Sequence, residues 1–123
     1  MIRVLVLDDV AAIGRAVQQC LREVAVVDPF VDPESAFVAL RAGAVYDVLL
    51  CDMELGASTG ADFERRIRDE FPALVPHLGF MSGGAVTVDA VRFLGAPGRV
   101  VIEKPFDLGA LRGAISRLLG RDW

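Results

Sequence analysis

The sequence predicts an α/β fold in which a parallel β-sheet is covered by helices on both faces. Short apolar segments alternate five times with segments of helical periodicity. This alternation is typical of parallel sheets with right-handed crossovers. A central segment, residues 48–51, is apolar throughout and leads into Asp52, with glycines at positions 56 and 60. Such an uninterrupted run is expected of a strand buried on both faces.

The first half of the chain contains three expected strands and two helices. The strands are residues 2–7, 24–27 and 47–52, with the second closed by Asp28 and Pro29. The first helix is expected over about residues 11–23, with apolar side chains at helical spacing: Ile13, Val17, Cys20, Leu21 and Val24. Asp32 as N-cap and Pro33 as first residue begin the second helix, and Gly43 ends it. Its buried face is expected to contain Ala36, Phe37, Val38 and Leu40.

The second half completes the alternation with strands at residues 78–81 and 99–102. A third helix is expected to begin at Thr59 or Gly60, with Phe63 and Ile67 as buried anchors, and to stop at residues 71–72. A short fourth helix is expected over residues 86–94. A last helix is capped by Asp107 and ended by Gly120, and its expected apolar face consists of Leu108, Leu111, Ile115, Leu118 and Leu119.

Composition limits the class of protein. The chain has 123 residues, which favours one domain over residues 1–123. Apolar residues make up 54% and charged residues 24%, a globular composition. The net charge of −4 and the lack of a Lys/Arg cluster argue against direct nucleic-acid binding. No apolar run has the length of a membrane span or a signal-peptide core, so we expect a cytoplasmic protein.

The cysteines and the histidine do not indicate a metal site or a catalytic site. Cys20 and Cys51 are expected to be small buried side chains in a reducing compartment. No second Cys or His stands at ligand spacing from either of them. His77 is the only histidine, which leaves little for a His-based metal site or a Ser-His-Asp triad.

Polar residues follow the expected strands at the ends where a parallel α/β sheet binds ligands. Asp8 and Asp9 follow the first strand, Asp52 the third, Ser82 the fourth and Lys104 the fifth. The topology places all of them along one rim. Each has an ordinary alternative: Asp8 or Asp9 could cap a helix, Ser82 could be a turn residue, Lys104 a surface lysine and Asp52 a strand-terminating acid. Four strand ends with complementary groups are harder to assign to chance.

The chemistry of this set favours phosphoryl transfer. Two like charges about 4 Å apart repel by roughly 4 kcal/mol at an effective dielectric of 20, so either a proton is retained or a cation is bound. Oxygen ligands without nitrogen or sulfur suit Mg²⁺. Lys104 and Ser82 could both donate to a phosphoryl oxygen. Carboxylates such as Asp52 act as nucleophiles in this chemistry.

Over essentially its whole length the chain resembles the receiver domains of bacterial two-component response regulators. The resemblance rests on the acidic pair Asp8-Asp9, the acceptor position Asp52, the hydroxyl of Ser82 and the Lys104-Pro105 pair. It implies a flavodoxin-like (βα)5 fold with strand order 2-1-3-4-5. It also implies a cis peptide before Pro105.

The resemblance further implies a function. Asp52 would accept a phosphoryl group from a histidine kinase or a histidine phosphotransfer domain, with Lys104 assisting. Mg²⁺ would be held by the Asp9 and Asp52 side chains and the main-chain carbonyl of Glu54, with Asp8 acting mostly through water. The chain would catalyse only its own phosphorylation and dephosphorylation, and would shift between inactive and active forms.

The chain departs from the family pattern at two positions, and two alternative functions stay open. Val101 stands three residues before the lysine, where the family commonly has an aromatic residue that rotates inward, so the usual hydroxyl–aromatic relay is in doubt. Ser82 replaces the commoner Thr, and residues 81–84 with 103–106 look most like receiver domains of hybrid histidine kinases. One alternative is a phosphorylation-independent interaction module that uses the face of the fourth helix, fifth strand and fifth helix. Another is a Mg²⁺-dependent phosphohydrolase with Glu54 as its second acid.

Overall fold

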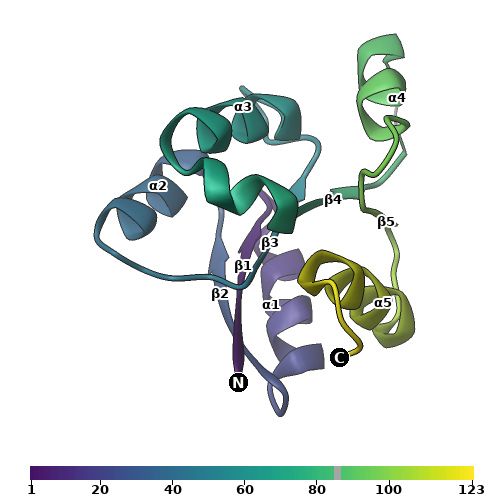
Figure 1. Ribbon diagram of the computed structural model, residues 1–123. Helices are drawn as coiled ribbons and strands as arrows, with labels where there is room; N and C mark the ends of the chain where they lie inside the picture. The colour runs from purple at the N-terminus through teal and green to yellow at the C-terminus, as the bar shows by residue number, and fades with distance from the viewer. Residues whose placement is uncertain (85–86) are drawn as a thin grey trace.

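Five parallel strands form the centre of the molecule. The structure, a computed structural model, describes residues 1–84 and 87–123. The strands are β1 (Ile2–Leu7), β2 (Ala25–Phe30), β3 (Val48–Asp52), β4 (Leu78–Ser82) and β5 (Val101–Glu103). They pair in the order β2-β1-β3-β4-β5, so the predicted flavodoxin-like topology is confirmed (Figure 1).

Helices cover both faces of this sheet. They are α1 (Ala11–Leu21), α2 (Pro33–Arg41), α3 (Gly60–Glu70), α4 (Val88–Leu94) and α5 (Leu108–Leu119), with a 3₁₀ helix, η1 (Pro72–His77), before β4. Side chains of α1 and α5 share one apolar cluster with one face of the sheet. Side chains of α2 and α3 share a second cluster with the other face. Figure 1 shows α1 and α5 on one side of the sheet and α2 and α3 on the other.

The central strand β3 is the most buried part of the sheet. All five of its residues are buried, and Leu50 belongs to one apolar cluster while Leu49 and Cys51 belong to the other. Burying one such leucine contributes about 1.5–3 kcal/mol relative to leaving it exposed. This packing on both faces fixes the carboxyl end of β3, and with it the position of Asp52.

The ends of the helices follow the local sequence signals. Asp32 accepts a hydrogen bond from the Ser35 N–H at 2.7 Å, and Asp107 accepts one from the Ala110 N–H at 2.7 Å. Thr59 forms a capping box with Asp62 at the start of α3. Gly120 ends α5 in the left-handed conformation, with φ of 73°. Capping of this kind is worth about 1 kcal/mol per helix. The predicted starts of α2, α3 and α5 are confirmed.

Several predicted boundaries were wrong because tertiary contacts override local signals. β2 continues through Asp28 and Pro29 to Phe30. Since β2 is an edge strand, a proline without an N–H can be accommodated there. The first helix ends at Leu21, two residues before the predicted end. β5 covers Val101–Glu103 instead of residues 99–102, and the 3₁₀ helix η1 was not predicted.

The predicted buried faces also need correction at three positions. Val38 is 66% exposed and Leu108 is 45% exposed, because the buried stripes of α2 and α5 are narrower than the apolar pattern suggested. Cys20 is exposed, whereas Cys51 is buried as expected. α4 begins at Val88 with Thr87 as its N-cap, and the predicted start at residue 86 lies outside the described residues.

Candidate functional site

Four strand ends bring polar side chains to one rim of the sheet. Asp8 follows β1, Asp52 ends β3, Ser82 ends β4 and Lys104 follows β5. Asp8, Asp52 and Ser82 are 1%, 5% and 6% exposed, and they are the buried polar side chains among the described residues. Burying polar groups without partners is costly, so their contacts with one another determine what the rim can do.

Three carboxylates gather at the centre of this rim. One oxygen from each of Asp8, Asp9 and Asp52 lies within 4.8 Å of the others. Asp9 is exposed, whereas Asp8 and Asp52 are buried. Asp8 also accepts a hydrogen bond from the Val10 N–H at 2.9 Å, which orders the turn into α1. Val10 itself is the N-cap of α1, so neither acid is the capping residue.

Lys104 lies between the two buried carboxylates. Its Nζ is 2.6 Å from Asp8 Oδ2 and 3.3 Å from Asp52 Oδ1. The Lys104 N–H donates to the carbonyl of Ser82 at 2.7 Å, and the Lys104–Pro105 peptide is cis, as the resemblance implied. Lys104 is the only lysine in the chain, and the other twelve basic residues are arginines. The position thus carries a compact ammonium where the chain otherwise uses planar guanidinium groups.

The electrostatics of the rim favour a bound cation. Burial raises the pKa of the Asp52 carboxyl, and the nearby charge of Asp8 raises it further, against the opposing effects of Lys104 and a backbone hydrogen bond from Glu54. Burial lowers the pKa of Lys104, but its contacts with Asp8 and Asp52 outweigh this and the net shift is upward. Three carboxylates and one ammonium leave two negative charges in excess. A divalent cation would balance them.

The donor set fits Mg²⁺ better than a softer metal. All three grouped ligands are carboxylate oxygens, and Asp9 is open to solvent, so a cation there could keep several of its waters. Glu54 follows two residues after Asp52 and its side chain is exposed, outside the group of three acids. The predicted role of its main-chain carbonyl stays a prediction.

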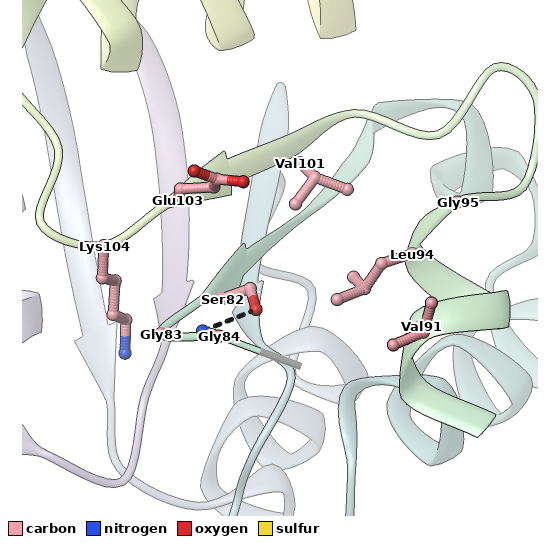
Figure 2. Close-up of a pocket in the computed structure, with 9 residues that line it drawn as sticks. All are labelled: Ser82, Gly83, Gly84, Val91, Leu94, Gly95, Val101, Glu103 and Lys104. Carbon is pink, nitrogen blue, oxygen red and sulfur yellow. Dashed lines mark hydrogen bonds between the residues drawn. The ribbon is translucent and has the colours of Figure 1, made fainter. Parts of the chain in front are cut away.

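A groove extends from the rim between β5 and α4. It has a volume of about 490 Å³, with Ser82 and Lys104 at one end. Ser82 Oγ accepts a hydrogen bond from the Gly84 N–H at 3.2 Å. Figure 2 shows Val101 of β5 facing Val91 and Leu94 of α4 across the other end. The sequence shows directly that position 101 is a valine and not an aromatic residue. It did not predict the open groove beside Val101.

One positioning residue was recognised from the sequence only as a helix start. A Cβ atom on Gly60 would lie 3.0 Å from the Asp52 carbonyl oxygen and 3.0 Å from the Phe80 ring. The Gly60 N–H donates to the Met53 carbonyl at 2.9 Å. Glycine at this position therefore lets the start of α3 pack closely against the end of β3. Its spacing after Asp52 was the only available signal.

Comparisons with known proteins identify the class to which this fold and rim belong. Residues 4–116 match the family model of the response regulator receiver domain. The chain belongs to this family, and the expectation from the Asp8-Asp9, Asp52 and Lys104-Pro105 motifs is confirmed at the level of the family. Membership supports a phosphoacceptor role for the acidic rim, because receiver domains are generally signalling modules of that kind.

Solved structures support the same fold. The chain is similar to a CheY-like response regulator receiver domain protein from Methanospirillum hungatei JF-1, with a TM-score of 0.81 and 20% identity over 98% of this chain and 94% of that one. A response regulator receiver protein from Sinorhizobium medicae WSM419 gives a TM-score of 0.78 and 24% identity over 97% and 94%. The chemotaxis response regulator CheY4 of Vibrio cholerae gives a TM-score of 0.76 and 22% identity over 97% of this chain and 99% of that one.

Two further findings are negative. No curated protein matches the chain significantly. Among the described residues, no helix combines the length and apolar character that crossing a membrane would require.

Proposed function

We propose that this chain is a phosphoacceptor receiver domain, formed by residues 1–123, that acts in two-component or phosphorelay signalling in the cytoplasm. Asp52 accepts a phosphoryl group from the phosphohistidine of a histidine kinase or a histidine phosphotransfer domain. The observation that carries this proposal is the position of Lys104, whose Nζ contacts both Asp8 and Asp52 across the rim. A lysine so placed can balance charge on a phosphoryl group attached to Asp52.

In the proposed reaction a carboxylate oxygen of Asp52 attacks phosphorus. The new P–O bond forms as the P–N bond to the donor imidazole breaks, and the imidazole nitrogen keeps the electron pair and is protonated by solvent. Asp9 and Asp52, with the Glu54 carbonyl, would hold Mg²⁺, and Asp8 would act through its waters. When bound, Mg²⁺ supplies charge neutralisation on the phosphoryl oxygens. Lys104 and the Ser82 hydroxyl donate to the same oxygens, and the aspartyl phosphate shifts the balance between inactive and active forms.

The proposal is tested by phosphorylation in vitro. The purified chain, incubated with a small phosphodonor and Mg²⁺, should gain one phosphoryl group by intact-mass measurement. Reduction with borohydride followed by peptide mapping should locate the acyl phosphate at Asp52. Chelating Mg²⁺ before the phosphodonor is added should prevent labelling. A stable label on a hydroxyl residue, or equal labelling with and without the chelator, would contradict the proposal.

Replacing Asp9 tests whether its carboxylate is a metal ligand. We expect Asp9→Ala to weaken Mg²⁺ binding by roughly tenfold or more, because an exposed carboxylate ligand is lost. Mg²⁺ should raise the melting temperature of the wild type by mass action and raise that of Asp9→Ala much less. Asp69→Ala, which removes an exposed acid of α3, serves as the matched control. Equal Mg²⁺ responses in all three proteins would rule out Asp9 as a ligand.

A second candidate function is an interaction module that does not need phosphorylation. It is favoured by Val101, which cannot perform the aromatic rotation common in the family, and by the exposed Val88 and Val91 on α4. In that case the face formed by α4, β5 and α5 would bind its protein partner constitutively. Equal partner affinity with and without beryllofluoride, a phosphoryl mimic, would favour this function over the first.

A phosphohydrolase has less support. The exposed Glu54 side chain lies outside the group formed by the other three acids. Multiple turnovers on a small phosphate ester would nevertheless establish that activity, whereas a single acyl phosphate per chain would not.

A further inference from the structure

α4 is attached to the rest of the molecule by few side chains. Of its residues only Ala90 is buried, and Val88 and Val91 are 67% and 56% exposed. Figure 1 shows α4 standing out from the other helices beside β4 and β5. The groove next to Ser82 lies on its β5 side, and a second hollow of about 600 Å³ lies toward α3. α4 therefore has open volume on both sides.

A stack of side chains anchors the C-terminal end of α4. The ring of Phe93 packs edge-on against Phe80 of β4, with centroids 5.0 Å apart and an interplanar angle of 83°. The guanidinium of Arg99, which precedes β5, lies 3.6 Å from the Phe93 centroid. Arg99 also forms an ion pair with Glu64 of α3. We call Glu64, Arg99 and Phe93 the α4 clasp.

The clasp is largely buried, and its geometry requires an arginine at position 99. The side chains of Arg99 and Glu64 are only 19% and 14% exposed, so their pair is weakly screened by solvent. Arg99 Nε is buried and has no hydrogen-bond partner among the described atoms. The guanidinium is thus positioned by the Phe93 ring and by Glu64 rather than by a full set of hydrogen bonds. A lysine could carry the charge but not the planar stack.

We propose that Arg99 is a positioning residue of the switch, which holds α4 through Phe93 and thereby sets the groove beside Ser82. In this proposal the clasp belongs to the unphosphorylated state and stabilises the α4 position of that state. Loosening it shifts the population toward the position favoured by the phosphorylated state. The link to the switch rests on the proposed function, whereas the attachment of α4 by the clasp does not.

The chain contains a matched control for this chemistry. Arg66 lies 4.1 Å from the centroid of Phe37 and pairs with Glu34 at 2.6 Å. These three residues belong to α2 and α3 and line neither cavity beside α4. Arg66→Met therefore removes the same kind of arginine–phenylalanine–glutamate contact without touching α4.

The first test measures amide hydrogen exchange in residues 88–94 of the unphosphorylated, metal-free chain. Arg99→Met should raise exchange there by roughly tenfold, because the helix opens locally more often. Glu64→Gln should raise it less, Arg99→Lys should not restore protection, and Arg66→Met should leave it within about twofold of the wild type. Unchanged exchange in both clasp variants, or equal increases with Arg66→Met, would overturn the proposal.

The second test measures beryllofluoride affinity in the presence of Mg²⁺. By linkage, a variant that destabilises the unliganded α4 position should bind the mimic more tightly, by roughly fivefold for Arg99→Met. Simple loss of stability would leave affinity unchanged or weaken it, so either of these results would overturn the role in switching. If the wild type does not bind beryllofluoride, the proposed function fails and so does the link to switching. The exchange measurement still decides whether the clasp holds α4.

Discussion

Replacing Asp52 with asparagine is expected to abolish phosphoryl labelling and, at the same time, to stabilise the metal-free fold. Labelling is lost because an amide is a poor nucleophile for phosphorus. Stability rises because the buried Asp52 carboxylate faces the Asp8 carboxylate, with Lys104 shared between them. The substituted amide would keep the shape of the side chain and remove one of the two like charges. Sites that function at a cost in stability commonly gain about 1 kcal/mol when such a residue is neutralised.

The pH dependence of this gain follows from the direction of the pKa shift. The pKa of Asp52 in the folded chain is raised above its ordinary value of 3.8, by burial first and by Asp8 second. A raised carboxyl pKa gives the wild type a contribution that is present below the unfolded pKa and lost as the pH rises through the folded pKa. In chelator, Asp52→Asn and the wild type should therefore differ least at low pH and most near pH 7.

Denaturant unfolding at several pH values measures the stability effect, and intact mass measures the label. Asp69→Asn on the exposed face of α3 is the control, expected to leave both within experimental scatter. Loss of label together with a lower free energy of unfolding would mean that Asp52 contributes contacts to the fold beyond those identified around the rim. If Asp52→Asn were still labelled, another residue would be the nucleophile.

The composition of the acidic rim could be predicted from the sequence because parallel topology converts position in the chain into position in space. Asp8 and Lys104 are 96 residues apart in the chain. Each nevertheless directly follows a strand of the sheet that Asp52 also belongs to, at the end of β3. The periodicity of the apolar segments determines those strands. Small boundary errors, such as the two residues at the end of α1, do not move a strand end to the other edge of the sheet.

The pairings within the rim could not be predicted, since they depend on rotamers and on distances well below the spacing between strands. The sequence suggested that Lys104 serves Asp52, but its Nζ lies closer to Asp8, at 2.6 Å against 3.3 Å. The α4 clasp was missed for a related reason. The sequence predicts Arg99 only as the first residue of the last strand, and nothing in its local pattern indicates that Phe93 and Glu64 will contact it.

Replacing Lys104 with methionine should have the largest combined effect on stability and labelling. Asp8, whose side chain is fully buried, would lose its 2.6 Å partner, and Asp52 would lose its nearest cation. Removing one partner of a buried pair typically costs about 3–5 kcal/mol, and the 18% exposure of Lys104 places the expected loss near the lower figure. This loss should be greatest in chelator, where no metal is present to offset the charge of the two carboxylates.

Mg²⁺ should separate the two roles of Lys104. A divalent cation at the acidic rim offsets the excess negative charge, and at about 100 times its dissociation constant it would restore roughly 2.7 kcal/mol to the stability of Lys104→Met. Labelling should nevertheless stay roughly 100-fold slower than in the wild type, because the ammonium that donates to the phosphoryl group is gone. Lys104→Arg retains the positive charge but not the compact ammonium, so it should recover most of the stability and little of the labelling rate. If Mg²⁺ restored both properties of Lys104→Met, Lys104 would be a counter-charge for Asp8 and Asp52 and would take no part in the transfer.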